Sequence, residues 1–310
     1  MAQATFGIDH PLVTVRDHGL ILSRYRALGF RPSPASHHPW GTVTALAMFP
    51  DNFIELIGVA DAARLGAPEG LSDGGLSFGR FLGDFLARQE GLSLVALHSR
   101  DARADYGLAL RRGLPGQGFI DFRRAMTKAD GTPDVAVVSL ALLVDDALPE
   151  ASNFLCHQHR PELIWVPEWQ DHPNGARGVA AVTYVAPVPA AAGALAARWR
   201  ALYGDGRLRP AEVVGEVDGG VVADTGCGLL RSVTPERAEA LYPGVAAPRF
   251  PTAALRPHGL SLTVAVESLD RAERALDAGG APFHRTPRGT LAVPADFCGN
   301  VIVEFQAAAG

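Results

Sequence analysis

Residues 6–29 read FGIDHPLVTVRDHGLILSRYRALG, and this stretch decides the fold because it holds one strand and one helix with their boundary signals. The apolar run that ends at Val15 predicts a strand. Asp17 is typical of a helix N-cap, apolar residues follow it at near-helical spacing, and Gly29 is typical of a helix end. Two β-like runs come next, at 42–49 and 52–59. The pattern therefore predicts the order strand, helix, strands.

The same order returns three more times, and the units start roughly every 80–90 residues, which indicates an internal repeat. The alternative is an ordinary α+β chain of unrelated segments. Each later unit has a predicted strand, a helix, a glycine that ends the helix, and two further strands: 91–98, 102–112, Gly113, 135–144 and 153–159; 178–186, 190–203, Gly204, 213–217 and 221–224; 260–266, 270–278, Gly279, 290–293 and 301–305.

Two stretches lie outside the repeat, at 60–90, with a helix expected near 78–89, and at 233–257. The turn-forming sequence Pro173-Asn174-Gly175 interrupts the pattern of strands and helices, which is typical of a junction between domains. We therefore expect two domains, residues 1–172 with the functional site and residues 173–310 with a structural role.

Composition narrows the functional class. The 310 residues are 47% apolar and carry a formal net charge of -5, which argues against a nucleic-acid partner. The pair Arg123–Arg124 is expected on a solvated face. Three cysteines without a CxxC pair indicate reduced thiols in the cytoplasm. No apolar run is long enough to span a membrane, so no membrane partner is expected.

Several motifs in residues 6–176 resemble the vicinal-oxygen-chelate superfamily, in particular its bacterial glyoxalase-like branch. The second half matches only in the order of its elements. The resemblance implies an α+β fold of four βαβββ units, paired into two glyoxalase-like domains. The matching stretches are Gly7-Ile8-Asp9-His10, His38-Pro39-Trp40-Gly41-Thr42, Asn52-Phe53-Ile54-Glu55-Leu56, Cys156-His157-Gln158-His159-Arg160-Pro161-Glu162 and His172-Pro173-Asn174-Gly175-Ala176.

The resemblance also implies a divalent metal, held by a histidine on the first strand of a unit and a carboxylate on its last strand. Carried over, these positions are His10 and Glu55, with His159 from the second unit. Leu94 stands near the fourth position and cannot bind metal, so the set departs from the family pattern. Two imidazoles and one carboxylate suit Fe, Zn, Mn or Ni.

Each ligand has a plainer interpretation. His10 could hydrogen-bond across a barrel mouth. Glu55 lies among apolar residues, and burying a carboxylate unpaired is costly, so it either faces solvent or meets a cation, metal or donor. Strand alternation places His157 and His159 on one face of their strand and Cys156 and Gln158 on the other.

His157 is a competing ligand, and an alternative register makes Glu162 the ligand of the second unit. Either Glu162 or His157 is a candidate for moving protons in catalysis.

Five further residues are candidate substrate contacts. His38 and Trp40 form either a pocket wall with a stacking indole or a surface hairpin. Arg160 could bind a substrate carboxylate or pair with Glu162. His172 and Asn174 belong either to a lid over the pocket or to a domain linker.

Three functions follow, each with a small-molecule partner. The first is a metal-dependent glyoxalase-like enzyme that acts on an oxygenated or aromatic metabolite by isomerase, lyase or oxygenase chemistry. The second is a metal-free binding protein of the resistance type, with Trp40, Phe53 and Trp165 as walls. The third is a ring-cleaving dioxygenase with its iron in the second half of the chain. It is disfavoured because the first strand of the third unit offers only Thr183 and Tyr184, and no histidine, as a metal ligand. A homodimer is also expected from the resemblance.

Overall fold

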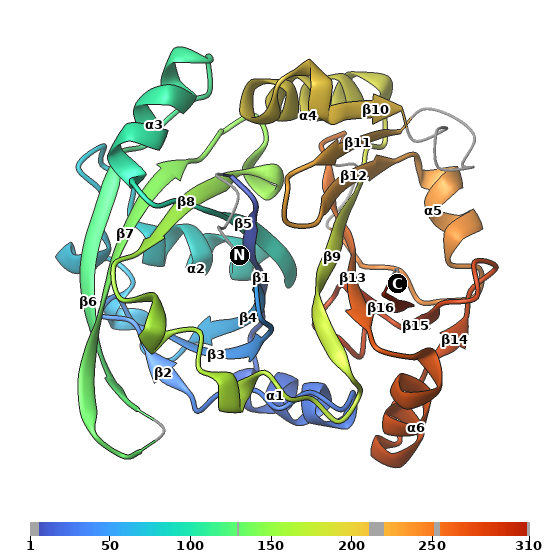
Figure 1. Ribbon diagram of the computed structural model, residues 1–310. Coiled ribbons are helices and arrows are strands. Elements are labelled where there is room, and N and C mark those ends of the chain that lie inside the picture. The colour runs from blue at the N-terminus through green and yellow to red at the C-terminus, as the bar shows by residue number, and fades with distance from the viewer. Residues whose placement is uncertain (1–5, 129, 211–219, 251–254, 309–310) are drawn as a thin grey trace.

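The chain forms two eight-stranded sheets that lie side by side in a computed structural model, which describes residues 6–128, 130–210, 220–250 and 255–308 (Figure 1). The strand orders are β2-β3-β4-β1-β5-β8-β7-β6 and β10-β11-β12-β9-β13-β16-β15-β14. Each sheet joins two βαβββ units through their antiparallel first strands, β1 with β5 and β9 with β13. The predicted α+β fold of four paired units is therefore confirmed.

The first sheet uses strands between residues 8 and 158. Its elements are β1 (Ile8–Thr14), α1 (His18–Ala27), β2 (Ser36–His37), β3 (Thr42–Met48), β4 (Phe53–Val59), α2 (Phe78–Arg88), β5 (Gly91–His98), α3 (Ala102–Arg111), β6 (Phe119–Thr127), β7 (Pro133–Leu143) and β8 (Asn153–Gln158).

The second sheet uses strands between residues 176 and 307. Its elements are β9 (Ala176–Val185), α4 (Pro189–Tyr203), β10 (Leu208–Pro210), β11 (Val221–Asp224), β12 (Leu229–Val233), α5 (Pro235–Leu241), β13 (His258–Val266), α6 (Leu269–Gly279), β14 (His284–Arg285), β15 (Leu291–Val293) and β16 (Ile302–Ala307).

The predicted boundary signals of the helices are mostly correct. The Asp17 carboxylate accepts a hydrogen bond from the backbone N–H of Leu20 at 2.8 Å and so caps α1. Gly29 ends this helix region with a φ of +82°, which favours glycine. One signal is wrong by a residue, because α6 includes Gly279 and the left-handed residue is Gly280.

Several strands of the described chain were not predicted. Three of them, β2, β10 and β14, are only two or three residues long, which is too short for a periodic pattern to show. The longer ones are β12, in a segment that the repeat pattern left unassigned, and β6, which carries Arg123 and Arg124. The expected strand at 213–217 lies outside the described residues.

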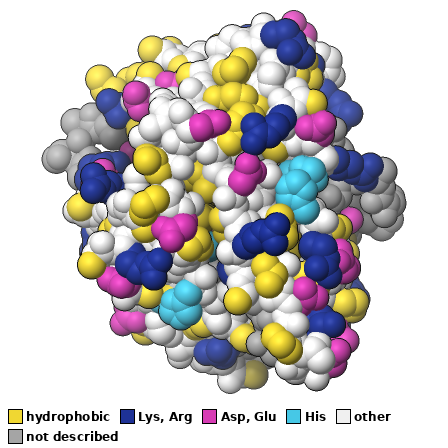
Figure 2. Space-filling model, turned by 90° about the vertical axis from the view of Figure 1, so that its left-hand side faces the viewer, with side chains coloured by type: hydrophobic (Ala, Val, Ile, Leu, Met, Phe, Trp, Pro, Cys, Tyr) yellow, Lys and Arg dark blue, Asp and Glu magenta, His cyan; other side chains and the backbone are white. Residues whose placement is uncertain are grey.

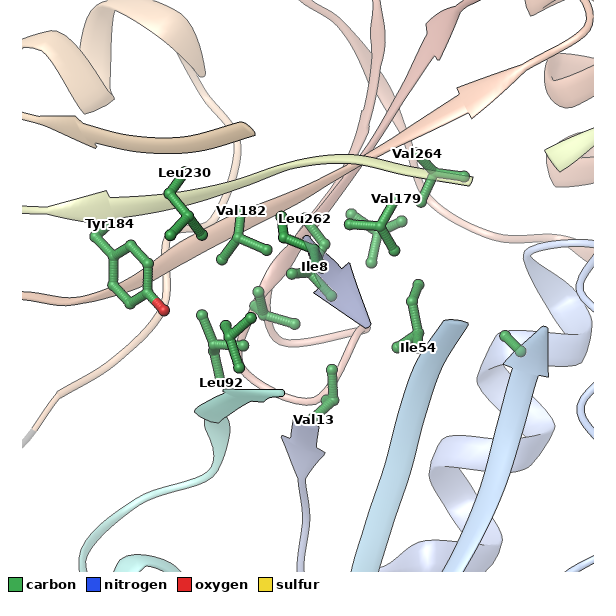
Figure 3. Close-up of a cluster of buried hydrophobic side chains, with 14 of the residues drawn as sticks. Ile8, Val13, Ile54, Leu92, Val179, Val182, Tyr184, Leu230, Leu262 and Val264 are labelled. Carbon is green, nitrogen blue, oxygen red and sulfur yellow. The ribbon is translucent and has the colours of Figure 1, made fainter. Parts of the chain in front are cut away.

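Alternation along the strands sends neighbouring residues of one strand into different clusters of the core. On β1, Val13 packs into a large cluster shared by both sheets, whereas Leu12 packs into a second cluster on the other face of the first sheet. The shared cluster lies where the two sheets face each other (Figure 3). Its labelled members are Ile8, Val13, Ile54 and Leu92 from the first sheet and Val179, Val182, Tyr184, Leu230, Leu262 and Val264 from the second.

Two features of the surface bear on partners. Within the described residues, no helix is both long enough and apolar enough to cross a bilayer. On the face shown in Figure 2, basic and acidic side chains are intermixed, without one continuous basic area.

Candidate functional site

A small pocket lies against the first sheet, with a volume of about 50 Å³. This is room for only a few water molecules. Its wall combines aromatic and polar side chains. The aromatic residues include Trp40, Phe53, Phe122 and Phe154, and the polar ones are His10, His38, Glu55, Arg124, Cys156 and Gln158.

His10 lies at the centre of the polar groups. The pairing of β1 with β5 shifts register between Ile8 and His10, which marks a bulge. At this bulge the side chains of the neighbours Asp9 and His10 contact each other, with Nδ1 2.5 Å from Oδ1. The other ring nitrogen, Nε2, lies 3.3 Å from Oε2 of Glu55. The ring stacks on Phe53 with 4.2 Å between centroids, so its orientation is held from three sides.

Asp9 joins His10 to a second buried histidine, His98, at the end of β5. The Asp9 Oδ2 atom lies 2.6 Å from Nδ1 of His98, whose Nε2 lies 2.8 Å from the backbone oxygen of Asp51. Burial opposes protonation of both rings, yet their carboxylate partners raise the pKa of His10 to about 9 and that of His98 to about 10. Burial alone would raise the pKa of Asp9, but the two imidazoles outweigh it and hold this pKa well below its usual range.

Glu55 is the buried carboxylate that faces these groups. It is 7% exposed and lies on β4, opposite Leu12 of β1 in the parallel ladder. Burial raises the pKa of its carboxyl, but the contact with His10 outweighs burial and holds the value at about 2. The predicted pair His10 and Glu55 therefore meets in the folded chain.

His38 approaches Glu55 from the other side. Its Nε2 lies 4.0 Å from Oε1 of Glu55, and its Nδ1 lies 3.0 Å from the hydroxyl of Thr42. The ring stacks on Trp40 at 4.9 Å with an interplanar angle of 2°. Burial, reinforced by the charge of Arg124, lowers the pKa of His38 to about 3, so the ring is neutral at physiological pH. The structure thus favours a pocket wall over a surface hairpin for His38 and Trp40.

The face of β8 that points into the pocket is the one that carries Cys156 and Gln158, and His159 lies on the other face. Cys156 and Gln158 line the pocket, as alternation along the strand requires. His159 is exposed, and its Nε2 lies 2.8 Å from the hydroxyl of Ser139. The structure therefore separates His159 from His10 and Glu55, which corrects the predicted trio.

His157 and Glu162, at the end of β8 and just beyond it, also lie outside the pocket. His157 is half-buried, and Glu162 is exposed in a short 3-10 helix that follows the strand. Both line a separate surface cavity of about 430 Å³, which also has Asp9 in its wall. This cavity shares Cys156 and Gln158 with the pocket. Neither residue is placed to be the second unit's ligand inside the pocket.

Arg160 does not reach the pocket either. Its guanidinium pairs with Glu162 at 2.5 Å and with Asp134 at 3.2 Å. The structure therefore favours the ion pair over a substrate contact for Arg160.

His172 and Asn174 join the two halves of the chain instead of covering the pocket. His172 Nε2 donates to the backbone oxygen of Met48 at 2.7 Å, and its Nδ1 accepts from the N–H of Arg31. The Asn174 amide donates to the backbone oxygen of Leu28 at 2.9 Å. Both side chains are buried. Of the two expected alternatives, the structure therefore favours the domain linker over the lid, and neither side chain contacts the pocket as a substrate-binding residue would.

Arg124 is the main pocket residue that the sequence analysis missed. It was expected on a solvated face, but β6 directs it into the pocket, and burial lowers the pKa of its guanidinium. Asp9 and His98 were also missed. Each is a polar residue in an otherwise apolar strand, which is the signal that could have found them.

The second sheet has its own buried carboxylate, Glu304 on β16. Arg288 donates to Oε1 at 2.7 Å and Thr290 donates to it at 2.5 Å, while Thr263 and Tyr242 donate to Oε2 at 2.9 and 3.0 Å. Four donors, one of them cationic, therefore occupy this carboxylate.

The donor set of the first pocket fits a divalent metal. Asp9 holds Nδ1 of His10, which leaves Nε2 beside Glu55, and a carboxylate behind a ligating histidine is the usual outer partner at metal sites. His38 is a neutral third donor near the same carboxylate. Donor atoms of Asp9, His10 and Cys156 also lie within 4.8 Å of one another.

Comparisons with known proteins agree with this architecture. The family described as glyoxalase-like domain matches residues 8–203. No curated protein matches the sequence significantly.

Among solved structures, a hypothetical protein from Staphylococcus aureus has a TM-score of 0.63 at 11% identity, over 97% of this chain and 99% of that one. A mutant of 4-hydroxymandelate synthase from Streptomyces coelicolor has a TM-score of 0.55 at 11% identity, over 99% and 94%. A xylose isomerase-like TIM barrel/4-hydroxyphenylpyruvate dioxygenase fusion protein has a TM-score of 0.53 at 16% identity, over 100% and 51%. Since the family match covers more than half of its length, the chain belongs to the glyoxalase-like domain family, and its fold is the vicinal-oxygen-chelate fold.

Proposed function

We propose that the chain is a metal-dependent glyoxalase-like enzyme that acts on a small oxygenated or aromatic metabolite. One observation carries the proposal: His10 Nε2 lies 3.3 Å from a Glu55 oxygen while Asp9 holds the opposite ring nitrogen. Two donors of different strands thus face one point inside an apolar pocket, which is how a protein prepares a metal site.

His38 takes the place of His159 as the third donor in this proposal. The Nδ1 atom of its neutral ring contacts the hydroxyl of Thr42, so Nε2 faces Glu55 and can act as a metal donor. Two imidazoles and one carboxylate suit Fe, Zn, Mn or Ni, and Cys156 is a softer alternative donor.

A bound divalent cation would act as a Lewis acid toward two neighbouring oxygens of the substrate. The chain's own residues would do the rest. Asp9 and Phe53 fix the orientation of His10. Trp40 and Phe122 exclude water and accept a planar group. This supports isomerase, lyase or oxygenase chemistry without selecting one.

Metal content of the purified, untagged protein tests the proposal. We expect near-stoichiometric metal in the wild type by elemental analysis. The metal content should fall about tenfold or more in His10→Ala and Glu55→Gln, because each substitution removes a direct ligand of the metal. His159→Ala is the matched control and should keep its metal. Metal retained in both pocket variants, or absent from the wild type after supplementation, would contradict the proposal.

A metal-free binding protein is the second candidate, and one observation favours it. His10 lies between two carboxylates that raise its pKa to about 9, so its ring holds a proton at physiological pH. Metal would have to displace that proton. Trp40 and Phe53 would then be walls of the binding pocket, whereas Trp165 lines the neighbouring cavity. The same metal analysis separates the two candidates.

A ring-cleaving dioxygenase with its site in the second sheet has less support, because four donors already occupy Glu304.

We propose that residues 1–172 form the functional domain and residues 173–310 a structural one. The cytoplasmic location and the homodimer stay predictions.

A further inference from the structure

Arg124 is a pocket cation without a close counter-ion. No carboxylate of the described residues lies within ion-pair distance of its guanidinium, and its Nε atom is buried without a hydrogen bond. The buried Arg198 also has one nitrogen, Nη1, without a hydrogen bond, but it has a carboxylate, Asp145, at 3.9 Å. It donates in addition to Asn153 at 3.0 Å and to the backbone oxygen of Leu143. Leaving a desolvated guanidinium unpaired is costly, so Arg124 points to a missing anion.

Glu55 does not supply that anion at close range. It shares the pocket with Arg124, but its Oε2 atom lies against His10 and its Oε1 atom faces His38. The pocket therefore keeps one cation whose direct partner has to come from outside the described chain.

We infer that the small molecule bound in this pocket carries a carboxylate, which Arg124 binds. The inference rests on the proposed small-molecule function of the pocket. The planar guanidinium matches a carboxylate through two parallel hydrogen bonds. Aromatic side chains beside it, including Phe122 on the same strand, suit a compact or planar body.

A monoanionic carboxylate fits this site better than a phosphate. Arg124 is a single cation, and Glu55 in the same pocket would repel a second negative charge. Two other buried atoms of the lining have no partner, Nε1 of Trp40 and Oε1 of Gln158. They offer the ligand one further donor and one further acceptor.

Size limits the ligand as well. The pocket itself holds only about 50 Å³, so its occupant is small or extends toward the neighbouring cavity of about 430 Å³. Cys156 and Gln158 line both cavities, and a body larger than a few atoms would have to pass these side chains.

Binding of matched probes to metal-free protein tests the inference. Acetate is compared with acetamide, and benzoate with benzamide, by calorimetry and tryptophan fluorescence, because each pair differs mainly in charge. We expect at least one carboxylate to bind the wild type about tenfold more tightly than its amide, or better. The preference should be lost in Arg124→Gln and Arg124→Met and partly kept in Arg124→Lys. Arg123→Gln, at the exposed neighbour, is the matched control and should keep it.

Three outcomes would overturn the inference: no preference in the wild type, a preference that survives in Arg124→Gln, or inorganic phosphate binding more tightly than both carboxylates. Failure of both Arg124→Gln and Arg124→Met to fold by circular dichroism would make the residue structural and overturn it too. Metal analysis of the wild type and the same variants, as purified and before the metal is removed, separates the two proposals. A carboxylate preference without metal leaves the inference standing alone, and metal without the preference removes only the inference.

Discussion

Each sheet buries one glutamate at the same place in its repeat unit, yet the two carboxylates have different neighbours. Glu55 lies on β4, opposite Leu12 of the parallel first strand, and Glu304 lies on β16, opposite Thr263 of its parallel first strand. Two residues before these partners stand His10 in the first sheet and Ser261 in the second.

The difference lies in what surrounds the shared position. In the first sheet, the neighbours of Glu55 are His10 and His38, and its carboxylate lines a pocket that a metal or a substrate could enter. In the second, Arg288 supplies the positive charge and three hydroxyl groups supply the remaining hydrogen bonds to Glu304. Under the function proposed above, the same fold position would serve chemistry in the first half, whereas it serves stability in the second.

The largest expected effect separates these two roles. Glu304→Gln should lower the free energy of unfolding by about 3 kcal/mol, because it removes the negative charge to which Arg288 and three hydroxyl groups donate. Glu55→Gln should cost only about 1 kcal/mol, since His10 keeps Asp9 as a partner. Guanidinium unfolding of the whole chain measures both.

Glu239→Gln, at an exposed position of α5, is the control and should leave stability unchanged. Equal losses in Glu55→Gln and Glu304→Gln would break the comparison, because both carboxylates would then be structural.

The fold could be predicted from the sequence because its signals are local. Asp17 and Gly29 mark the helix ends, and the repeat of such signals indicates four units. Of the candidate site, His10 and Glu55 could be predicted because the resemblance to the vicinal-oxygen-chelate superfamily implies metal ligands on the first and last strands of a unit. The rest depends on facts that one strand does not contain.

Alternation groups Cys156 with Gln158 and His157 with His159, but it cannot say which pair faces the pocket. That choice depends on how β8 lies between β5 and β7 in the sheet. Arg124 was missed because its strand lacks a clear apolar pattern. The contact between the neighbours on β1 was missed as well, because it forms only at a bulge.

A second prediction concerns the joint between the two halves. Burial lowers the pKa of His172 below its ordinary value of 6.5, so the folded chain holds the ring neutral, with Asp171, Arg31 and Arg177 nearby. The unfolded chain binds a proton more readily below pH 6.5, and the contribution of His172 to stability is therefore full above that pH and lost as pH falls below it.

His172→Gln keeps a donor for Met48 but cannot titrate. We expect it to cost about 1–2 kcal/mol at pH 7.5 and roughly 1 kcal/mol less at pH 5.5, as measured by guanidinium unfolding. His284→Gln, which removes an exposed imidazole, is the matched control. A cost of His172→Gln that grows at low pH would mean that the folded state stabilises the charged ring.

The smallest expected effect concerns the residues that cap the N-termini of the helices. Asp17 caps α1 in the first unit, as Asp101 caps α3 and Ser268 caps α6. In α4 the N-cap position is Val188, which provides no side-chain cap. Asp17→Ala should lower the free energy of unfolding by about 1 kcal/mol, because the N–H of Leu20 loses its acceptor. Asp17→Asn should keep most of that stability, since an amide oxygen can accept the same bond. Equal losses in the two variants would assign the effect to the charge of Asp17 rather than to its hydrogen bond, and thermal unfolding of both distinguishes these cases.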